Sequence, residues 1–83
     1  MRILITGPTS FSGAFFIEAL AKAGHQVTTT FTQPIEAYQG VRALRAKKSL
    51  KYSTAYFGVR FGDDAFLDVI RNGDIDIFCH HGA

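Results

Sequence analysis

The chain has 83 residues, of which 47% are hydrophobic and 13% are aromatic, and its formal net charge at pH 7 is +2. This length fits one small domain, and this apolar share argues against intrinsic disorder. The net charge is too small to indicate nucleic-acid or membrane binding by itself. We therefore expect one folded, soluble domain over residues 1–83.

The N-terminus and the cysteine content bear on the cellular compartment. Arg2 is followed by three apolar residues before Thr6, a run too short for the core of a signal peptide or for a transmembrane helix. Cys79 is the only cysteine, so no disulfide can form within the chain. A reducing compartment is the usual setting for such a protein. We expect a cytoplasmic protein without a membrane partner.

Positive charge gathers in the middle of the chain, where residues 37–62 contain no carboxylate. A solvated helix face explains such a run most simply, and contact with phosphate or nucleic acid is the alternative. The cations are Arg42, Arg45, Lys47, Lys48, Lys51 and Arg60.

The first predicted elements are a strand, a turn and a helix. Residues 2–6 are aliphatic and β-branched without polar alternation, which is typical of a strand buried on both faces of a parallel sheet. Gly7 opens a turn, and Ser10 is a suitable N-cap for a helix over residues 14–23. Unpaired N–H groups and the dipole make the start of such a helix an anion site.

The helix over residues 14–23 carries apolar residues near the spacing of one buried stripe. Gly24 ends this helix, and the β-branched run over residues 27–32 predicts a second strand. The expected stripe consists of Phe15, Phe16, Ala19, Leu20 and Ala23.

The middle of the chain predicts a second helix and a third strand. Ile35, Tyr38, Val41 and Leu44 recur at helical spacing, so we expect a helix over residues 35–48. Gly40 within it costs about 1 kcal/mol relative to alanine, which leaves an irregular turn open there. Alternating apolar residues predict a strand over residues 55–61.

The last predicted elements are a helix over residues 64–71 and a strand over residues 75–79. Phe66, Leu67, Val69 and Ile70 form the apolar stripe of this helix. Strands that alternate with helices pair in parallel through right-handed crossovers. We therefore predict an α/β fold with a parallel four-stranded sheet in the order 3-2-1-4 and about three helices.

Three segments resemble the extended short-chain dehydrogenase/reductase family, the NAD-dependent epimerase/dehydratases. Residues 6–13, TGPTSFSG, are similar to the TGxxGFIG turn of the family, and residues 24–27, GHQV, match its GHxV entry into strand two. Residues 76–83, DIFCHHGA, resemble the segment DVVFHLAA that ends strand four. The resemblance spans the whole chain and implies a Rossmann-type half domain that binds NAD or NADP.

The resemblance implies a pyrophosphate site in the glycine-rich turn. Gly7 and Gly13 match its first and third glycines, and Thr9 and Phe11 lie within the same motif. Ser10 replaces the middle glycine, so its hydroxyl either reaches a phosphate oxygen or weakens the approach of the cofactor.

The resemblance also assigns residues to the rest of the cofactor. Thr32 aligns with the residue that usually selects NAD or NADP, and the absence of a carboxylate there favours NADP slightly. Asp63 either meets the adenine amino group or caps the third helix. Gly82 and Ala83 match the small pair whose backbone passes close to the cofactor.

No catalytic residue is expected within the chain. Family members use a tyrosine with a lysine four residues later, and here Tyr38, Tyr52 and Tyr56 are followed at that spacing by arginine, tyrosine and arginine. The resemblance places the catalytic and substrate-binding parts beyond Ala83, so we expect a truncated, inactive cofactor-binding portion of an oxidoreductase or epimerase. A stand-alone, non-catalytic nucleotide-binding or interaction module is the alternative.

Two further expectations concern the end of the chain. Cys79, His80 and His81 are adjacent on a strand, where successive side chains point to opposite faces, so we expect no metal site. The fourth strand is apolar on both faces and has an open edge, which predicts self-association or marginal stability as a monomer.

Overall fold

A computed structural model of the chain describes residues 1–80. Its strands form one parallel sheet in the order β3-β2-β1-β4, which confirms the predicted topology. β1 is one of the two interior strands, and its register pairs Ile3 with Val27 on one side and with Ile77 on the other. The strands are β1 (Arg2–Thr6), β2 (Gln26–Phe31), β3 (Thr54–Phe57) and β4 (Ile77–His80).

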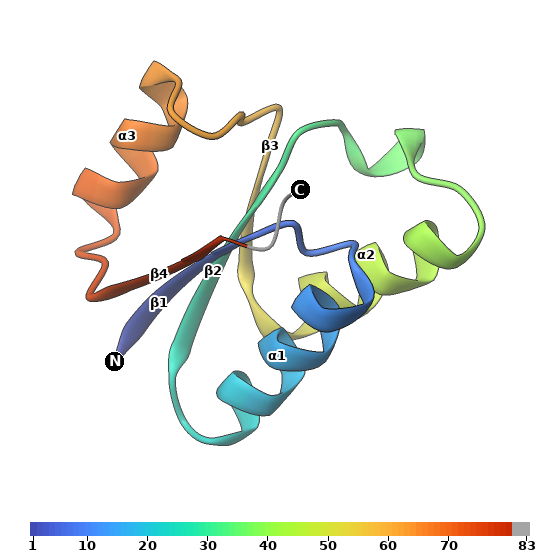
Figure 1. The fold of residues 1–83 in the computed structure, drawn as a ribbon, viewed down its shortest axis with the longest axis horizontal. Coiled ribbons are helices and arrows are strands. Elements are labelled where there is room, and N and C mark those ends of the chain that lie inside the picture. Colours follow the sequence, from blue (N-terminus) through green and yellow to red (C-terminus); the bar gives the residue numbers. More distant parts are fainter. Residues whose placement is uncertain (81–83) are drawn as a thin grey trace.

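The helices cover both faces of this sheet. Figure 1 shows α1 and α2 together on one face and α3 on the opposite face. Among residues 1–80, no helix has the length and apolar character that a membrane span requires. The helices are α1 (Phe11–Lys22), α2 (Val41–Tyr52) and α3 (Asp64–Asn72), with a single 3₁₀ turn, η1 (Ile35–Ala37), before α2.

The core has two halves because the side chains of β1 alternate across the sheet. Ile3 and Ile5 pack with Ile17 of α1 on one face. Leu4 packs on the other face against Phe66 of α3 and its neighbours. β1 is therefore buried on both faces, as its apolar sequence predicts.

The predicted apolar stripe of α1 is wrong, because four of its five residues, Phe15, Phe16, Ala19 and Ala23, are exposed and Leu20 is only partly buried. Phe15 and Phe16 are 60% and 45% exposed, and the buried residues of this helix are Gly13, Ala14 and Ile17. Gly13 packs directly against the carbonyl of the preceding turn, and this contact fixes which side of α1 faces the sheet.

The predicted helix over residues 35–48 is interrupted. Gly40 has φ 63° and ψ −134°, a conformation that no helix contains, and it separates η1 from α2. The apolar spacing is misleading here, because Val41 and Leu44 point to solvent. The buried residues of α2 are instead Ala46 and Ser49.

The third strand is shorter than predicted, and the fourth strand begins and ends later in the chain than predicted. β3 covers residues 54–57 instead of 55–61, because Gly58 turns the backbone with φ 71°. The N–H of Val59 still bonds the carbonyl of Phe31 at 2.9 Å. β4 covers residues 77–80 instead of 75–79.

The predicted caps of α1 and α3 agree with the structure, although α1 begins at Phe11 instead of residue 14 and α2 ends at Tyr52 instead of residue 48. The Ser10 hydroxyl accepts the N–H of Gly13 at the start of α1, and Gly24 follows that helix with φ 95°. The Asp63 carboxylate accepts the N–H of Phe66 and caps α3. These local rules of capping therefore hold where the apolar patterns of α1 and α2 do not.

Glu18 of α1 links the two helices on their shared face of the sheet. It lies 2.8 Å from Lys22 and 2.5 Å from Lys48 of α2. These two ammonium groups lower the pKa of Glu18 to about 2 from its ordinary 4.5. The carboxylate is therefore ionised at neutral pH and holds α2 against α1.

We expect the stabilising effect of Glu18 to depend on pH. A pKa that is lower in the folded state stabilises the fold above the unfolded pKa and stops doing so as the pH falls through the folded one. Thermal unfolding should show the wild type more stable than Glu18→Gln at neutral pH, with a difference that shrinks between about pH 5 and pH 2. A difference that stays constant over this range would contradict the ion pairs.

Candidate functional site

A cavity of about 660 Å³ opens at the carboxyl ends of the strands. Ligands of open parallel sheets bind at this end of the strands, where neighbouring connections run to opposite faces. In this sheet, β1 connects to α1 on one face, whereas β4 follows α3 on the other face. The cavity is lined by Thr6, Gly7, Pro8, Thr9, Ser10, Thr30, Phe31, Thr32, Gln33, Ala37, Tyr38, Gln39, Arg42, Val59, Phe61 and His80.

The turn after β1 forms one wall of the cavity and is closed by its own hydrogen bonds. Gly7 adopts φ 67°, which an L side chain rarely adopts. Its carbonyl accepts the N–H of Ser10 at 3.1 Å and the hydroxyl of Ser10 at 2.9 Å. The same hydroxyl accepts the N–H of Gly13 at 3.0 Å. The Ser10 proton is thus committed to the turn, so this hydroxyl has no second proton to donate to a ligand.

Gly13 lets α1 approach the turn closely. A Cβ at this position would lie 2.3 Å from the Gly7 carbonyl oxygen and 2.8 Å from the Ser10 hydroxyl. No real Cβ approaches a backbone atom so closely. The third glycine of the motif is therefore required by the packing of this turn, as the family resemblance implies.

Helix α2 supports the turn from behind. The Ser49 hydroxyl donates to the Pro8 carbonyl at 3.0 Å, and the Arg45 guanidinium donates to the Thr9 carbonyl at 3.4 Å. Arg45 also lies over the ring of Phe11 at 5.6 Å. Both carbonyls are therefore bonded by donors of α2.

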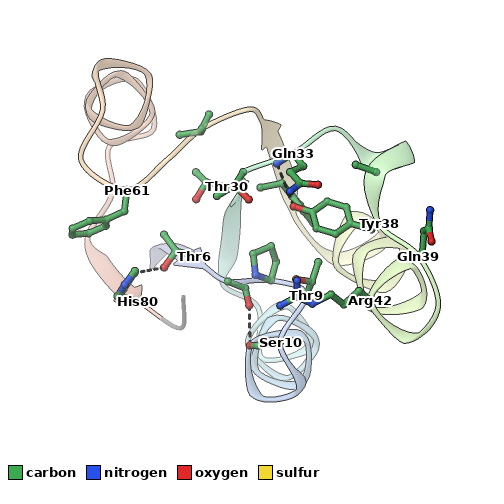
Figure 2. A pocket seen from close by; sticks show the side chains of 16 residues that line it. Thr6, Thr9, Ser10, Thr30, Gln33, Tyr38, Gln39, Arg42, Phe61 and His80 are labelled. Carbon is green, nitrogen blue, oxygen red and sulfur yellow. Dashed lines mark hydrogen bonds between the residues drawn. The ribbon is translucent and has the colours of Figure 1, made fainter. Parts of the chain in front are cut away.

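Polar side chains surround the cavity beyond β2. Figure 2 shows Tyr38 and Arg42 on this side of the cavity, opposite Thr6 and His80. Tyr38 packs edge-on against Phe31 at 5.8 Å, and its hydroxyl accepts the N–H of Gln33 at 3.3 Å. Arg42 is a cation in this wall, and no carboxylate is among the lining residues of the described chain. The cavity therefore favours anionic ligands.

His80 closes the opposite wall, at the end of β4. Its Nδ1 lies 2.6 Å from the hydroxyl of Thr6, and its ring packs on Phe61 at 4.7 Å (Figure 2). Phe61 in turn stacks on Phe78 at 5.7 Å. This wall consists of flat rings, and a side-chain hydrogen bond joins His80 to Thr6 of β1.

The structure brings together four of the predicted cofactor residues. Gly7, Thr9, Ser10 and Thr32 line the cavity, and Gly13 lies directly behind the turn. Two others face elsewhere, because Phe11 lies under Arg45 and Asp63 caps α3. Gly82 and Ala83 lie outside the described residues, as does His81.

Several lining residues are not among the predicted cofactor residues. Tyr38 and Arg42 come from the segment whose spacing predicts one continuous helix, and Phe61 belongs to a predicted strand. The sequence analysis considers His80 within the segment DIFCHHGA and as a residue at which no metal site is expected. Residues 1–80 contain no group of three histidine, cysteine or acidic side chains that could hold a metal. The rule that residues after each parallel strand meet at one edge would have indicated His80.

The comparisons with known proteins agree with this geometry at the level of the fold. No model of a known protein family matches the chain, and no curated protein matches it. Among solved structures, a complex of leucoanthocyanidin reductase with NADPH from Vitis vinifera superposes on the chain with a TM-score of 0.79 and 22% identity. The match covers 100% of this chain and 27% of the reductase. The chain therefore has a Rossmann-type α/β fold, with its cavity at the edge of the sheet where such folds bind ligands.

Proposed function

We propose that the chain binds a nicotinamide dinucleotide, as the cofactor-binding portion of an oxidoreductase or epimerase of the extended short-chain dehydrogenase/reductase family. The observation that carries this proposal is the turn over residues 7–13, which closes on itself and lines the cavity at the start of α1. The structurally similar reductase forms a complex with NADPH, which supports the same class of ligand.

The pyrophosphate is proposed to bind at this turn. The first helical N–H groups of α1 have no acceptor within the helix, and the helix dipole favours an anion beside them. The carbonyls of Gly7, Pro8 and Thr9 are all bonded to donors of the protein. Because these carbonyl oxygens already accept hydrogen bonds from the protein, they repel a bound anion less than free carbonyls would.

NADP is proposed as the preferred cofactor over NAD. The wall beyond β2 contains Arg42, the neutral Thr32 and no carboxylate among its described residues. An acidic residue in this region would bind the ribose 2′-hydroxyl of NAD, whereas a cationic side chain binds the 2′-phosphate of NADP. We place the 2′-phosphate beside Arg42.

Calorimetric titration of the 83-residue chain with NADPH and NADH tests this function. The proposal predicts that both bind and that NADPH binds more tightly, with an advantage that decreases at higher salt because the 2′-phosphate contact is ionic. Absence of binding for both cofactors at millimolar concentration would contradict the proposal. The chain has no tyrosine with a lysine four residues later, so we propose cofactor binding without catalysis.

The open edge of β4 is proposed as a surface for self-association. In the described part of the chain, β4 pairs with β1 alone, and Ile77 and Phe78 are 40% and 38% exposed. An exposed apolar edge is a template for pairing with another strand. Sedimentation velocity should therefore detect dimers at micromolar concentration, and a monomer over the whole concentration range would contradict this proposal.

A further inference from the structure

Ser49 makes an unusual use of its hydroxyl. It lies within α2 and is 0% exposed, yet its hydroxyl donates to the carbonyl of Pro8, 41 residues earlier. A serine inside a helix ordinarily points to solvent or bonds a carbonyl of its own helix. The buried hydroxyl of Ser49 instead connects α2 to the turn after β1.

This hydrogen bond fixes the direction of one peptide group. The peptide between Pro8 and Thr9 is trans and planar, so its C=O and its N–H point in opposite directions. Because Ser49 holds the carbonyl toward α2, the N–H of Thr9 points away from α2. That N–H has no acceptor among residues 1–80, and Thr9 lines the cavity.

Arg45 acts on the next peptide group in the same way. Its guanidinium donates to the Thr9 carbonyl at 3.4 Å, and its position over the Phe11 ring keeps it beside the turn. One turn of α2 separates Arg45 from Ser49, so both donors lie on the same side of the helix. Helix α2 therefore holds two successive carbonyls of the turn.

We infer that Ser49 is a positioning residue for the dinucleotide, which acts through the turn and not by touching the ligand. By holding the Pro8 carbonyl, it presents the N–H of Thr9 to the pyrophosphate and keeps the carbonyl oxygen away from it. Arg45 assists on the Thr9 carbonyl. This inference rests on the proposed binding of a dinucleotide in the cavity.

Ser49→Ala tests this role, with Ser53→Ala as its matched control. Ser53 follows the last residue of the same helix, and its hydroxyl donates to the Ser49 carbonyl at 2.7 Å and also lies 3.0 Å from the Thr29 hydroxyl. The control therefore loses two partly buried hydrogen bonds without touching the turn. Calorimetry should show that Ser49→Ala weakens NADPH binding by about fivefold, the effect of one hydrogen bond. Ser53→Ala should lower the melting temperature and change NADPH affinity less than about twofold.

Equal effects of both variants on NADPH affinity, or no effect of Ser49→Ala, would overturn the positioning role. If the wild type binds neither cofactor, the proposed function fails and the role of Ser49 toward a dinucleotide fails with it, whereas its effect on the turn is decided separately by the amide resonances of the free chain. ¹⁵N spectra should show that Ser49→Ala shifts the amides of Thr9 and Ser10, whereas Ser53→Ala does not. Unchanged amides in Ser49→Ala would overturn the inference independently of any ligand.

Arg45→Ala provides the same test if Ser49→Ala does not fold. Arg45 is only half-buried, so its loss is tolerated better than a change at Ser49. Its control is Lys47→Ala, which removes the same charge from an exposed position of α2 that does not line the cavity. Arg45→Ala should weaken NADPH binding by about threefold, and Lys47→Ala should not. Equal effects of the two variants would assign the change to net charge and overturn the role of α2.

Discussion

Replacing Gly13 with alanine is expected to lower NADPH affinity by about 100-fold, equivalent to ~2.7 kcal/mol. The added Cβ would lie 2.3 Å from the carbonyl oxygen of Gly7, so either α1 or the turn must move. Movement of the turn would break the bonds of Ser10 that close it. The overpacking should also destabilise the fold by about 2 kcal/mol. Calorimetry with NADPH and urea unfolding measure the two effects separately.

Gly73→Ala is the matched control for this prediction. A Cβ at Gly73 would crowd the carbonyl of Val69 at 2.9 Å, but at the end of α3, away from the cavity. This variant should lose stability and keep its affinity for NADPH while it is folded. If Gly13→Ala binds NADPH as tightly as the wild type, NADPH binding does not depend on the close contact between the turn and α1, and the prediction is wrong.

Replacing Arg42 with alanine is expected to remove the preference for NADPH. A hydrogen bond to a charged group contributes about 1.5–3 kcal/mol, so NADPH binding should weaken by about 20-fold. NADH has no 2′-phosphate, and its affinity should change less than about twofold. The effect should decrease at high salt because Arg42 is exposed.

Lys47→Ala controls for the loss of a positive charge on α2. Lys47 is exposed and does not line the cavity, so this variant should keep the ratio of the NADPH and NADH affinities. A wild type that binds NADH more tightly would contradict the proposed place of the 2′-phosphate. An Arg42→Ala variant that weakens both cofactors equally would do so too.

The elements that the sequence predicts well are those determined by local chemistry. The aliphatic run of β1 allows no solvated face, Ser10 and Asp63 cap their helices through their own side chains, and Gly7 adopts the positive φ that its turn requires. These features depend on residues that are close in sequence, so composition and spacing suffice to find them. Composition and spacing also suffice to predict the order of the strands, because right-handed crossovers allow few other orders.

The features that the sequence did not predict depend on contacts and backbone turns that apolar spacing does not reveal. Phe15 has the spacing of a buried residue, but the contact of Gly13 with Gly7 turns it outward. Arg42 enters the cavity wall because Gly40 ends the preceding turn and restarts the helix. Ser49 has no local signal, since its partner lies 41 residues away.

Mapping NADPH on the chain by ¹H–¹⁵N spectroscopy tests the central claim most directly. If the turn after β1 binds the pyrophosphate, saturating NADPH should shift the amides of Gly7, Thr9, Ser10 and Gly13 together with those beside Arg42. Shifts confined to the opposite ends of the strands, near His25 and Ser53, would contradict the claim, as would unchanged spectra at millimolar NADPH.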